Sequence, residues 1–138
     1  MPQNPQTIIK TLGMIPHPEG GWYVQTWRSS VGARPSGSAI YFLLESHQIS
    51  RWHRIDAAEI WHWYAGSALD LRREENGNIS HTILGPDLTS GQRPQCIIPP
   101  NTWQSATPLN DWVLVGCTVS PAFTFDTFEL APEGWEPG

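Results

Sequence analysis

Proline and glycine divide this chain into segments that are too short for long helices. The 138 residues include 13 prolines and 12 glycines, and both residue types end or bend regular structure. The segments between them are rich in aromatic and β-branched residues, which is the composition of strands. Roughly ten such segments follow one another at regular spacing, a pattern typical of β-sandwiches and barrels. The sequence therefore predicts an all-β fold.

We expect one domain over residues 1–138, with a barrel over about residues 20–130. A short helix is predicted over about residues 4–12, because Asn4 can cap it, Pro5 suits its first turn and Gly13 can end it. The predicted strands cover residues 22–27, 38–44, 50–55, 59–64, 69–73, 79–84, 95–98, 103–106, 112–119 and 123–130. Residues beyond 130 are interpreted as a tail.

Charged side chains are few and unevenly distributed along the chain. Residues 1–93 contain all eight Lys and Arg residues and eight of the 13 acids, whereas residues 94–138 contain five acids and no base. No basic stripe is present that could neutralise phosphates, so we expect neither a nucleic acid nor a membrane as a partner. The expected partner is a small molecule.

Two cysteines bear on the cellular compartment. Cys96 and Cys117 both lie in apolar, strand-like surroundings and lack the spacing of a redox pair. No secretory signal is visible near the amino terminus. We therefore expect reduced, buried thiols in a cytoplasmic protein.

One segment, residues 47–66, concentrates the ionisable and aromatic side chains. It resembles the first motif of the cupin superfamily, G-x5-H-x-H-x3-E-x6-G, whose two histidines and glutamate usually bind a metal inside a jelly-roll barrel. His53 matches the first histidine, Glu59 the glutamate and Gly66 the final glycine. Ile55 stands at the second histidine and His47 at the opening glycine.

A second segment, residues 93–108, resembles the other cupin motif, G-x5-P-x-G-x2-H-x3-N. Pro99 matches its proline, and Asn101 replaces the middle glycine, where a left-handed residue is needed. Gln104 stands at the metal-binding histidine. Arg93 and Pro108 replace the first and last motif residues.

Four further segments extend the resemblance to about residues 7–131. They are Glu19-Gly20-Gly21-Trp22, Thr26-Trp27-Arg28-Ser29, Glu59-Ile60-Trp61 and Val115-Gly116-Cys117-Thr118-Val119. Together they are similar to a small single-domain cupin family of undefined function. The resemblance implies an all-β cupin jelly roll, or double-stranded β-helix, like that of the dTDP-sugar epimerases, with a short N-terminal helix. It also implies a homodimer.

Strand parity and the motif match together predict a polar pocket. Glu59, Trp61 and Trp63 share one strand face, and His62 lies on the other. If Glu59 points into the barrel, as the resemblance implies, His62 points away from it. We expect His53, Glu59 and Gln104 to surround one cavity, with His53 and Glu59 as catalytic acid–base residues. The expected site holds no metal, since Ile55 cannot coordinate and an amide is a weak ligand.

Three more residues are candidates for ligand binding. Arg28 ends a predicted strand and could bind a carboxylate or phosphate, or else pair with Glu19 or a surface acid. Glu19 precedes a Gly-Gly break and could equally be a solvated loop carboxylate. Trp103 adjoins Gln104, although parity places it on the opposite face. We interpret three histidines as structural or exposed residues: His17, His47 and His81. We interpret four tryptophans as core residues: Trp52, Trp61, Trp63 and Trp112.

Three functions remain open from the sequence. The first is a metal-free isomerase, epimerase or lyase that acts on a polar or sugar-like substrate through His53 and Glu59. The second is a non-catalytic module that binds such a ligand. The third is a metal-dependent oxygenase or isomerase that holds a divalent transition metal through His53, Glu59 and Gln104.

Overall fold

The computed structural model describes residues 3–30 and 32–137. One helix, α1, spans Pro5–Leu12 as the sequence predicts, with Asn4 as its cap and Gly13 in a left-handed conformation at its end. The strands are β1 (Ile15–Pro16), β2 (Trp22–Arg28), β3 (Ser38–Leu44), β4 (Ser50–Arg54), β5 (Ala58–Gly66), β6 (Leu69–Glu75), β7 (Asn78–Leu84), β8 (Gln95–Ile98), β9 (Gln104–Pro108), β10 (Val113–Ser120) and β11 (Glu129–Leu130). Two 3₁₀ turns, η1 (Leu88–Ser90) and η2 (Phe125–Thr127), complete the elements.

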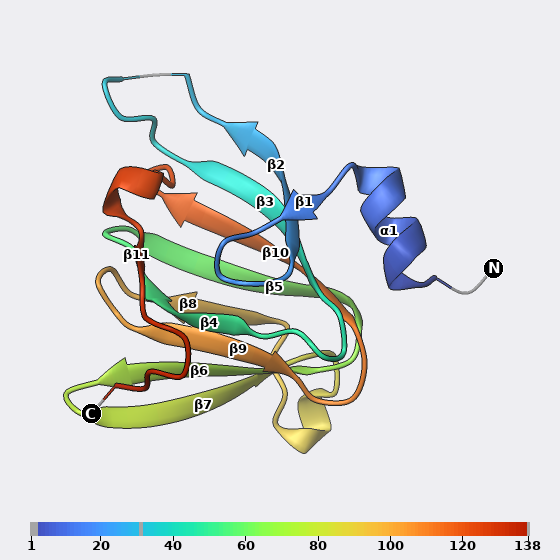
Figure 1. Cartoon of the computed structure of the whole chain (residues 1–138). Coiled ribbons are helices and arrows are strands. Elements are labelled where there is room, and N and C mark those ends of the chain that lie inside the picture. Colours follow the sequence, from blue (N-terminus) through green and yellow to red (C-terminus); the bar gives the residue numbers. More distant parts are fainter. Residues whose placement is uncertain (1–2, 31, 138) are drawn as a thin grey trace.

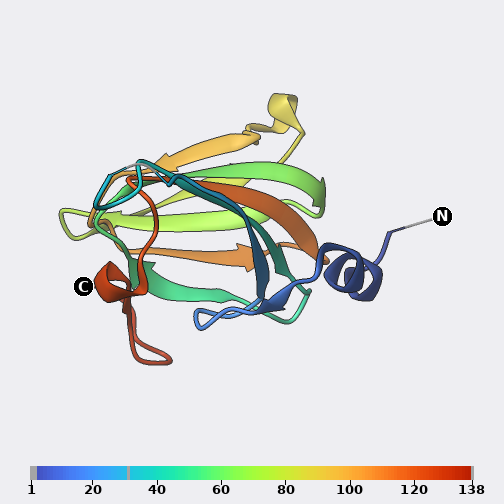
Figure 2. The ribbon, with the colours of Figure 1, turned by 90° about the horizontal axis from the view of Figure 1, so that it is seen from above.

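These strands form two antiparallel sheets that face each other (Figure 1). One sheet has the strand order β1-β2-β3-β10-β5-β8, and the other has the order β11-β4-β9-β6-β7. Figure 2 shows the two layers edge-on, with α1 outside the barrel. The apolar residue Ile8 of α1 packs with Leu43 and Met14 against the outer face of the first sheet. No helix in the described part of the chain is long and apolar enough to cross a membrane.

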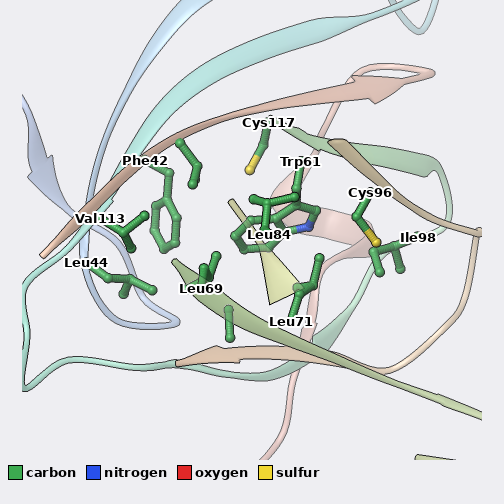
Figure 3. Close-up of a cluster of buried hydrophobic side chains, with 12 residues drawn as sticks. Phe42, Leu44, Trp61, Leu69, Leu71, Leu84, Cys96, Ile98, Val113 and Cys117 are labelled. Atoms are coloured by element: carbon green, nitrogen blue, oxygen red, sulfur yellow. The ribbon is translucent and has the colours of Figure 1, made fainter. Parts of the chain in front are cut away.

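The main hydrophobic core lies between the inner faces of the two sheets (Figure 3). The first sheet contributes residues such as Phe42, Trp61 and Val115, and the second contributes Leu69 and Leu71. Cys96 and Cys117 are free and buried, as expected. Each fully buried side chain of this size stabilises the fold by roughly 1.5–3 kcal/mol. This cluster fills the part of the barrel beside the cavity described below.

The structure corrects the predicted strand over residues 123–130. Most of that segment is a loop with the 3₁₀ turn η2, and only Glu129–Leu130 pairs with β4. Its aromatic residues gave it a strand-like composition, but three of them pack against a single histidine ring, as shown below. The short strand β1 was not predicted.

Tryptophan placement differs in part from the expectation. Trp61 is a core residue, and Trp63 packs partly buried against the same cluster. Trp52 is buried, but it neighbours the inward-facing His53 on β4 and therefore lies on the outer face. There the Arg72 guanidinium covers its ring at 4.8 Å. Trp112 is half-buried in the cluster beneath α1.

Candidate functional site

A cavity of about 460 Å³ opens beside the core, between the two sheets. Its lining residues with carboxyl, imidazole or guanidinium groups are His17, Glu19, Arg28, His53, Glu59 and Asp126, and the Cys117 thiol also lines it. Its remaining walls are mainly apolar and aromatic: Tyr23, Ile40, Phe42, Ile55, Trp61, Val119, Phe123 and Phe125. Arg28, Phe125 and Asp126 are exposed and form its rim, whereas the two glutamates and His53 are buried.

Strand pairing aligns four residues of the cavity in one row across the first sheet. Val119 of β10 pairs with Glu59 of β5 on one side and with Ser38 of β3 on the other. Ser38 in turn pairs with Arg28 of β2. One row across the sheet therefore begins at Arg28 and ends at Glu59, three strand spacings apart, or about 14 Å between backbones. All four residues of this row line the cavity.

A register shift in β2 brings Arg28 to the cavity. Simple alternation groups Arg28 with Trp22 and Val24, which pack under α1 on the outer face. The pairing with β3 shifts between Gln25 and Trp27, however, so the strand carries one extra residue there. A bulge of this kind reverses the faces of the residues that follow it. Arg28 consequently shares the cavity with Gln25.

Glu19 is held inside the barrel by a tight turn rather than exposed in a loop. The Gly20 N–H donates to the His17 carbonyl at 3.0 Å, and the Arg51 N–H donates to the Glu19 carbonyl at 2.9 Å. Gly21 has φ +77°, and a Cβ there would lie 2.7 Å from the Leu43 carbonyl oxygen. Only glycine tolerates both conditions, so the Gly-Gly sequence directs the Glu19 side chain inward.

His17, Glu19 and His53 form one buried cluster. Glu19 Oε1 lies 3.5 Å from His17 Nδ1 and 3.5 Å from His53 Nε2. Its other oxygen accepts a short hydrogen bond from the Ser50 hydroxyl. His17, which the sequence indicated was structural or exposed, is only 9% exposed and lines the cavity. Its only sequence signal is its place in the His-Pro-Glu-Gly-Gly turn.

Hydrogen bonds to the backbone show which ring nitrogens of this cluster carry a hydrogen. His53 Nδ1 lies 2.7 Å from the Arg51 carbonyl oxygen, which only accepts, so Nδ1 carries a hydrogen. His17 Nδ1 accepts from the Glu19 backbone N–H at 3.1 Å. With Glu19 ionised and both rings neutral, only lone pairs would meet at Glu19 Oε1. A proton on Glu19 or on one of the rings would therefore make these contacts attractive.

Glu59 is on β5, and its carboxyl group is contacted by hydrogen-bond donors from other strands. Gln104 Nε2 donates to Glu59 Oε1 at 2.8 Å, and the Cys117 thiol also donates to this carboxylate. Trp61 Nε1 donates to Gln104 Oε1 at 2.9 Å, which fixes the orientation of the amide. These donors favour the carboxylate, but burial opposes them more strongly and raises the pKa of Glu59 to about 7.

Burial shifts the other ionisable groups in the same sense, toward their neutral forms. It raises the pKa of Glu19, against the opposing effects of His17 and the Ser50 hydrogen bond. It lowers the pKa of His53 and of His17, although the neighbouring carboxylates oppose this. Burial also raises the pKa of the Cys117 thiol, which remains a hydrogen donor. The site therefore combines weak acids and neutral imidazoles near neutral pH.

Gln104 does not line the cavity, contrary to the expectation that it shares it with His53 and Glu59. It is fully buried behind Glu59, between that carboxylate and Trp61. Its oxygen is occupied by the indole and its nitrogen faces the carboxylate, so it cannot act as a metal ligand in this arrangement. The alternative metal set of His53, Glu59 and Gln104 does not fit. Within residues 3–30 and 32–137, no three His, Cys, Asp or Glu side chains form a metal-binding group.

Trp103 also lies outside the cavity, which corrects its assignment as a ligand-binding residue. Gln104 points inward, so its neighbour points outward, as parity indicates. The Trp103 ring packs between the Arg54 guanidinium, at 4.6 Å, and Trp135 of the carboxyl-terminal segment, at 4.7 Å. His62 faces away from Glu59 as expected, and is half-buried near Thr118.

An aromatic loop between β10 and β11 closes one side of the cavity. Phe123, Phe125 and Phe128 surround His17 with ring centroids 5.9–6.4 Å away. Arg28 Nη1 donates to the Phe123 carbonyl at 2.6 Å, and Arg34 binds the Ala122 carbonyl and Asp56. Sequence reasoning missed this wall because it assigned the segment to a regular strand.

Comparison with known protein families identifies the family of this chain. The family described as Cupin superfamily (DUF985) matches residues 6–131. The chain belongs to this family. Comparison with curated proteins gives no match.

Solved structures agree with this assignment. The crystal structure of a Shewanella oneidensis protein is 38% identical to this cupin, with a TM-score of 0.90 over 94% of this chain and 85% of that one. A hypothetical protein from Leishmania major is 25% identical, with a TM-score of 0.86 over 94% and 88% of the two chains. Oxalate decarboxylase from Bacillus subtilis shares the fold alone, at 11% identity and a TM-score of 0.63 over 83% of this chain and 29% of that enzyme.

Proposed function

We propose that this cupin binds a small organic molecule in the cavity and moves protons on it without a metal, as an isomerase or epimerase. The observation that carries the proposal is the pairing of Glu59, whose pKa lies at about 7, with the cluster of Glu19 and His53 on the same cavity. Groups whose environments set different protonation states supply an acid and a base together.

The proposed reaction is an enolisation next to a carbonyl group. The Glu59 carboxylate removes a proton from the carbon atom, and the electron pair of that C–H bond forms the C=C bond of an enol. The proton held between Glu19 and His53 passes to the carbonyl oxygen as its C=O double bond becomes single. Where the deprotonated carbon bears a hydroxyl group, Glu59 then returns its proton to the former carbonyl carbon, which takes the C=C electron pair. The hydroxyl proton passes back to Glu19 and His53 as the new C=O bond forms, so the isomerisation needs no oxidant or reductant.

Hydrogen exchange provides the test of this proposal. In D₂O near pH 7, the protein should introduce deuterium beside the carbonyl of a panel of 2-oxo acids and ketoses, followed by NMR. Glu59→Gln should lose the catalysed exchange by about 100-fold or more, the range expected for a general base. The matched control is Glu133→Gln, because Glu133 is exposed in the carboxyl-terminal segment. Equal rates for the wild type and Glu59→Gln would refute proton transfer and leave the non-catalytic binding function.

A direct titration adds a check that does not depend on the substrate. The ¹³C chemical shift of the Glu59 carboxyl should titrate near pH 7 in the free protein. Titration at the ordinary value of a glutamate would remove the acid–base basis of the proposal.

A further inference from the structure

Among the residues that line the cavity, Arg28 is the only lysine or arginine, and it lies at the rim. Arg28 Nη1 donates to the Phe123 carbonyl, which uses one of five guanidinium N–H groups. Among the described residues, no carboxylate lies within ion-pair distance of Arg28. Asp126 is the other charged rim residue, and it is exposed. A guanidinium anchored by one bond, with its other donors unpaired by acids, is suited to bind a carboxylate or phosphate.

The walls between Arg28 and Glu59 are mainly apolar, with Gln25, Ser38 and Thr124 as their uncharged polar residues. The aliphatic side chains of the lining are Ile40, Ile55 and Val119, and its rings include Phe42, Trp61 and Phe123. Phe125 adds a ring at the rim and is 52% exposed, so its ring is accessible to a ligand. A sugar would leave many hydroxyl groups facing these walls without partners, and each such group is costly to bury.

The buried carboxylates do not form a site for a positively charged ligand. Glu19 accepts from the Ser50 hydroxyl, and Glu59 accepts from Gln104 and the Cys117 thiol. The protein therefore already supplies hydrogen donors to both acids. The positive charge available to a ligand is that of Arg28.

From these observations we propose that the ligand is a small carboxylate or phosphate with a flat or otherwise apolar body, whose anionic group binds Arg28 while its body lies along the aromatic wall toward Glu59. This inference rests on the proposed function for the location of the reacting atoms. The sequence predicted a polar or sugar-like substrate. This inference replaces that class with a narrower one, an anion with an apolar body. The backbone separation of about 14 Å, shortened by the two side chains, leaves room for a body the size of one ring and a short chain.

A matched series of probes tests the class of ligand. We would measure binding of 3-phenylpropionate, its neutral amide, 3-phenylpropylamine and glucose 6-phosphate, by calorimetry and by the fluorescence of the tryptophans. The first three share one body and differ only in charge. We expect 3-phenylpropionate to bind at least about tenfold more tightly than the amide, because a bidentate ion pair is lost in the amide. The amine and the sugar phosphate should bind more weakly still.

Variants then assign the anion to its site. Arg28→Gln should reduce the affinity for 3-phenylpropionate to that of the amide, and Arg28→Lys should retain part of it. Asp126→Asn, the matched change at the other charged rim residue, should leave the affinity unchanged or raise it. Phe125→Ser should weaken binding of the acid and the amide equally, because both lose the same apolar contact.

Several outcomes would overturn the inference. Tighter binding of the amine or of glucose 6-phosphate than of 3-phenylpropionate would do so, as would an affinity that Arg28→Gln does not change. These results are separable from the proton-transfer proposal, because 3-phenylpropionate has no carbonyl group that could be enolised and its binding is measured without turnover. Arg28-dependent binding without deuterium exchange would keep the ligand class and refute the reaction.

Discussion

Glu59→Gln should change the pH dependence of stability as well as activity. Glutamine keeps the size of the side chain and an oxygen that can still accept from Gln104, but it cannot ionise. The pKa of Glu59 rises from 4.5 to about 7 on folding, because the side chain is buried. The folded state thus binds this proton more tightly than the unfolded state does. Its contribution to stability is present below about pH 4.5 and is lost as the pH rises through about 7.

The magnitude follows from the size of the shift. A difference of one pKa unit corresponds to about 1.4 kcal/mol, so the full effect is about 3 kcal/mol. Between about pH 5 and about pH 8, the wild type should lose about 2.5 kcal/mol of unfolding free energy through this group. Glu59→Gln lacks that loss. Relative to the wild type, the variant should therefore be more stable at about pH 8 than at about pH 5 by about 2.5 kcal/mol.

Urea denaturation of both proteins at the two pH values measures this double difference. The other titrating groups, including Glu19 and the two histidines, are present in both proteins and largely cancel. Glu133→Gln serves again as the exposed control, and its double difference should be close to zero. A double difference below about 1 kcal/mol for Glu59→Gln would refute the reasoning that burial holds this carboxyl neutral.

Three further predictions concern the surroundings of the site. Gln104→Met should destabilise the protein by about 2–4 kcal/mol in urea, because the Trp61 indole and the Glu59 carboxylate both lose a buried partner; a loss below about 1 kcal/mol would show that the amide is dispensable. Dialysis against a chelator should leave the melting temperature within about 1–2 °C of its starting value, and elemental analysis should find well under one transition metal per chain; near-stoichiometric metal that survives dialysis would contradict this. Asn4→Ala should cost about 1 kcal/mol, because its side chain accepts from the Thr7 N–H at 2.9 Å, while the titration of Glu59 stays unchanged; a shifted titration would show that α1 is coupled to the site.

Local chemistry was enough to predict the helix and most strands. Asn4, Pro5 and Gly13 fix the ends of α1 through groups next to one another in the chain, and the strand over residues 38–44 has the bounds that its apolar run predicts. Alternation also grouped Glu59 with Trp61 on one face of β5 and His62 on the other, and the resemblance placed Glu59 on the inner face, where it and Trp61 are buried. The family resemblance added the jelly roll, which the structure and the comparisons confirm.

Alternation fails where a strand gains a residue or where the chain leaves the sheet. The bulge in β2 moved Arg28 to the cavity face, and nothing in the local sequence marks that extra residue. The loop over residues 123–128 has a strand-like composition, yet its rings pack around His17, a partner about one hundred residues away in sequence.

The sequence by itself determined which side chains face the inside of each regular strand, because that depends on a period of two residues. The tertiary structure alone decided which of them meet. His17 and Glu19 come from a turn before β2, His53 from β4 and Glu59 from β5, and they share one cavity because the two sheets fold over each other. The same packing places Gln104 behind Glu59, whereas Trp103 lies on the outer surface, as parity indicates. Burial then set the protonation of these groups, and burial is a property of the packed barrel rather than of any segment of the chain.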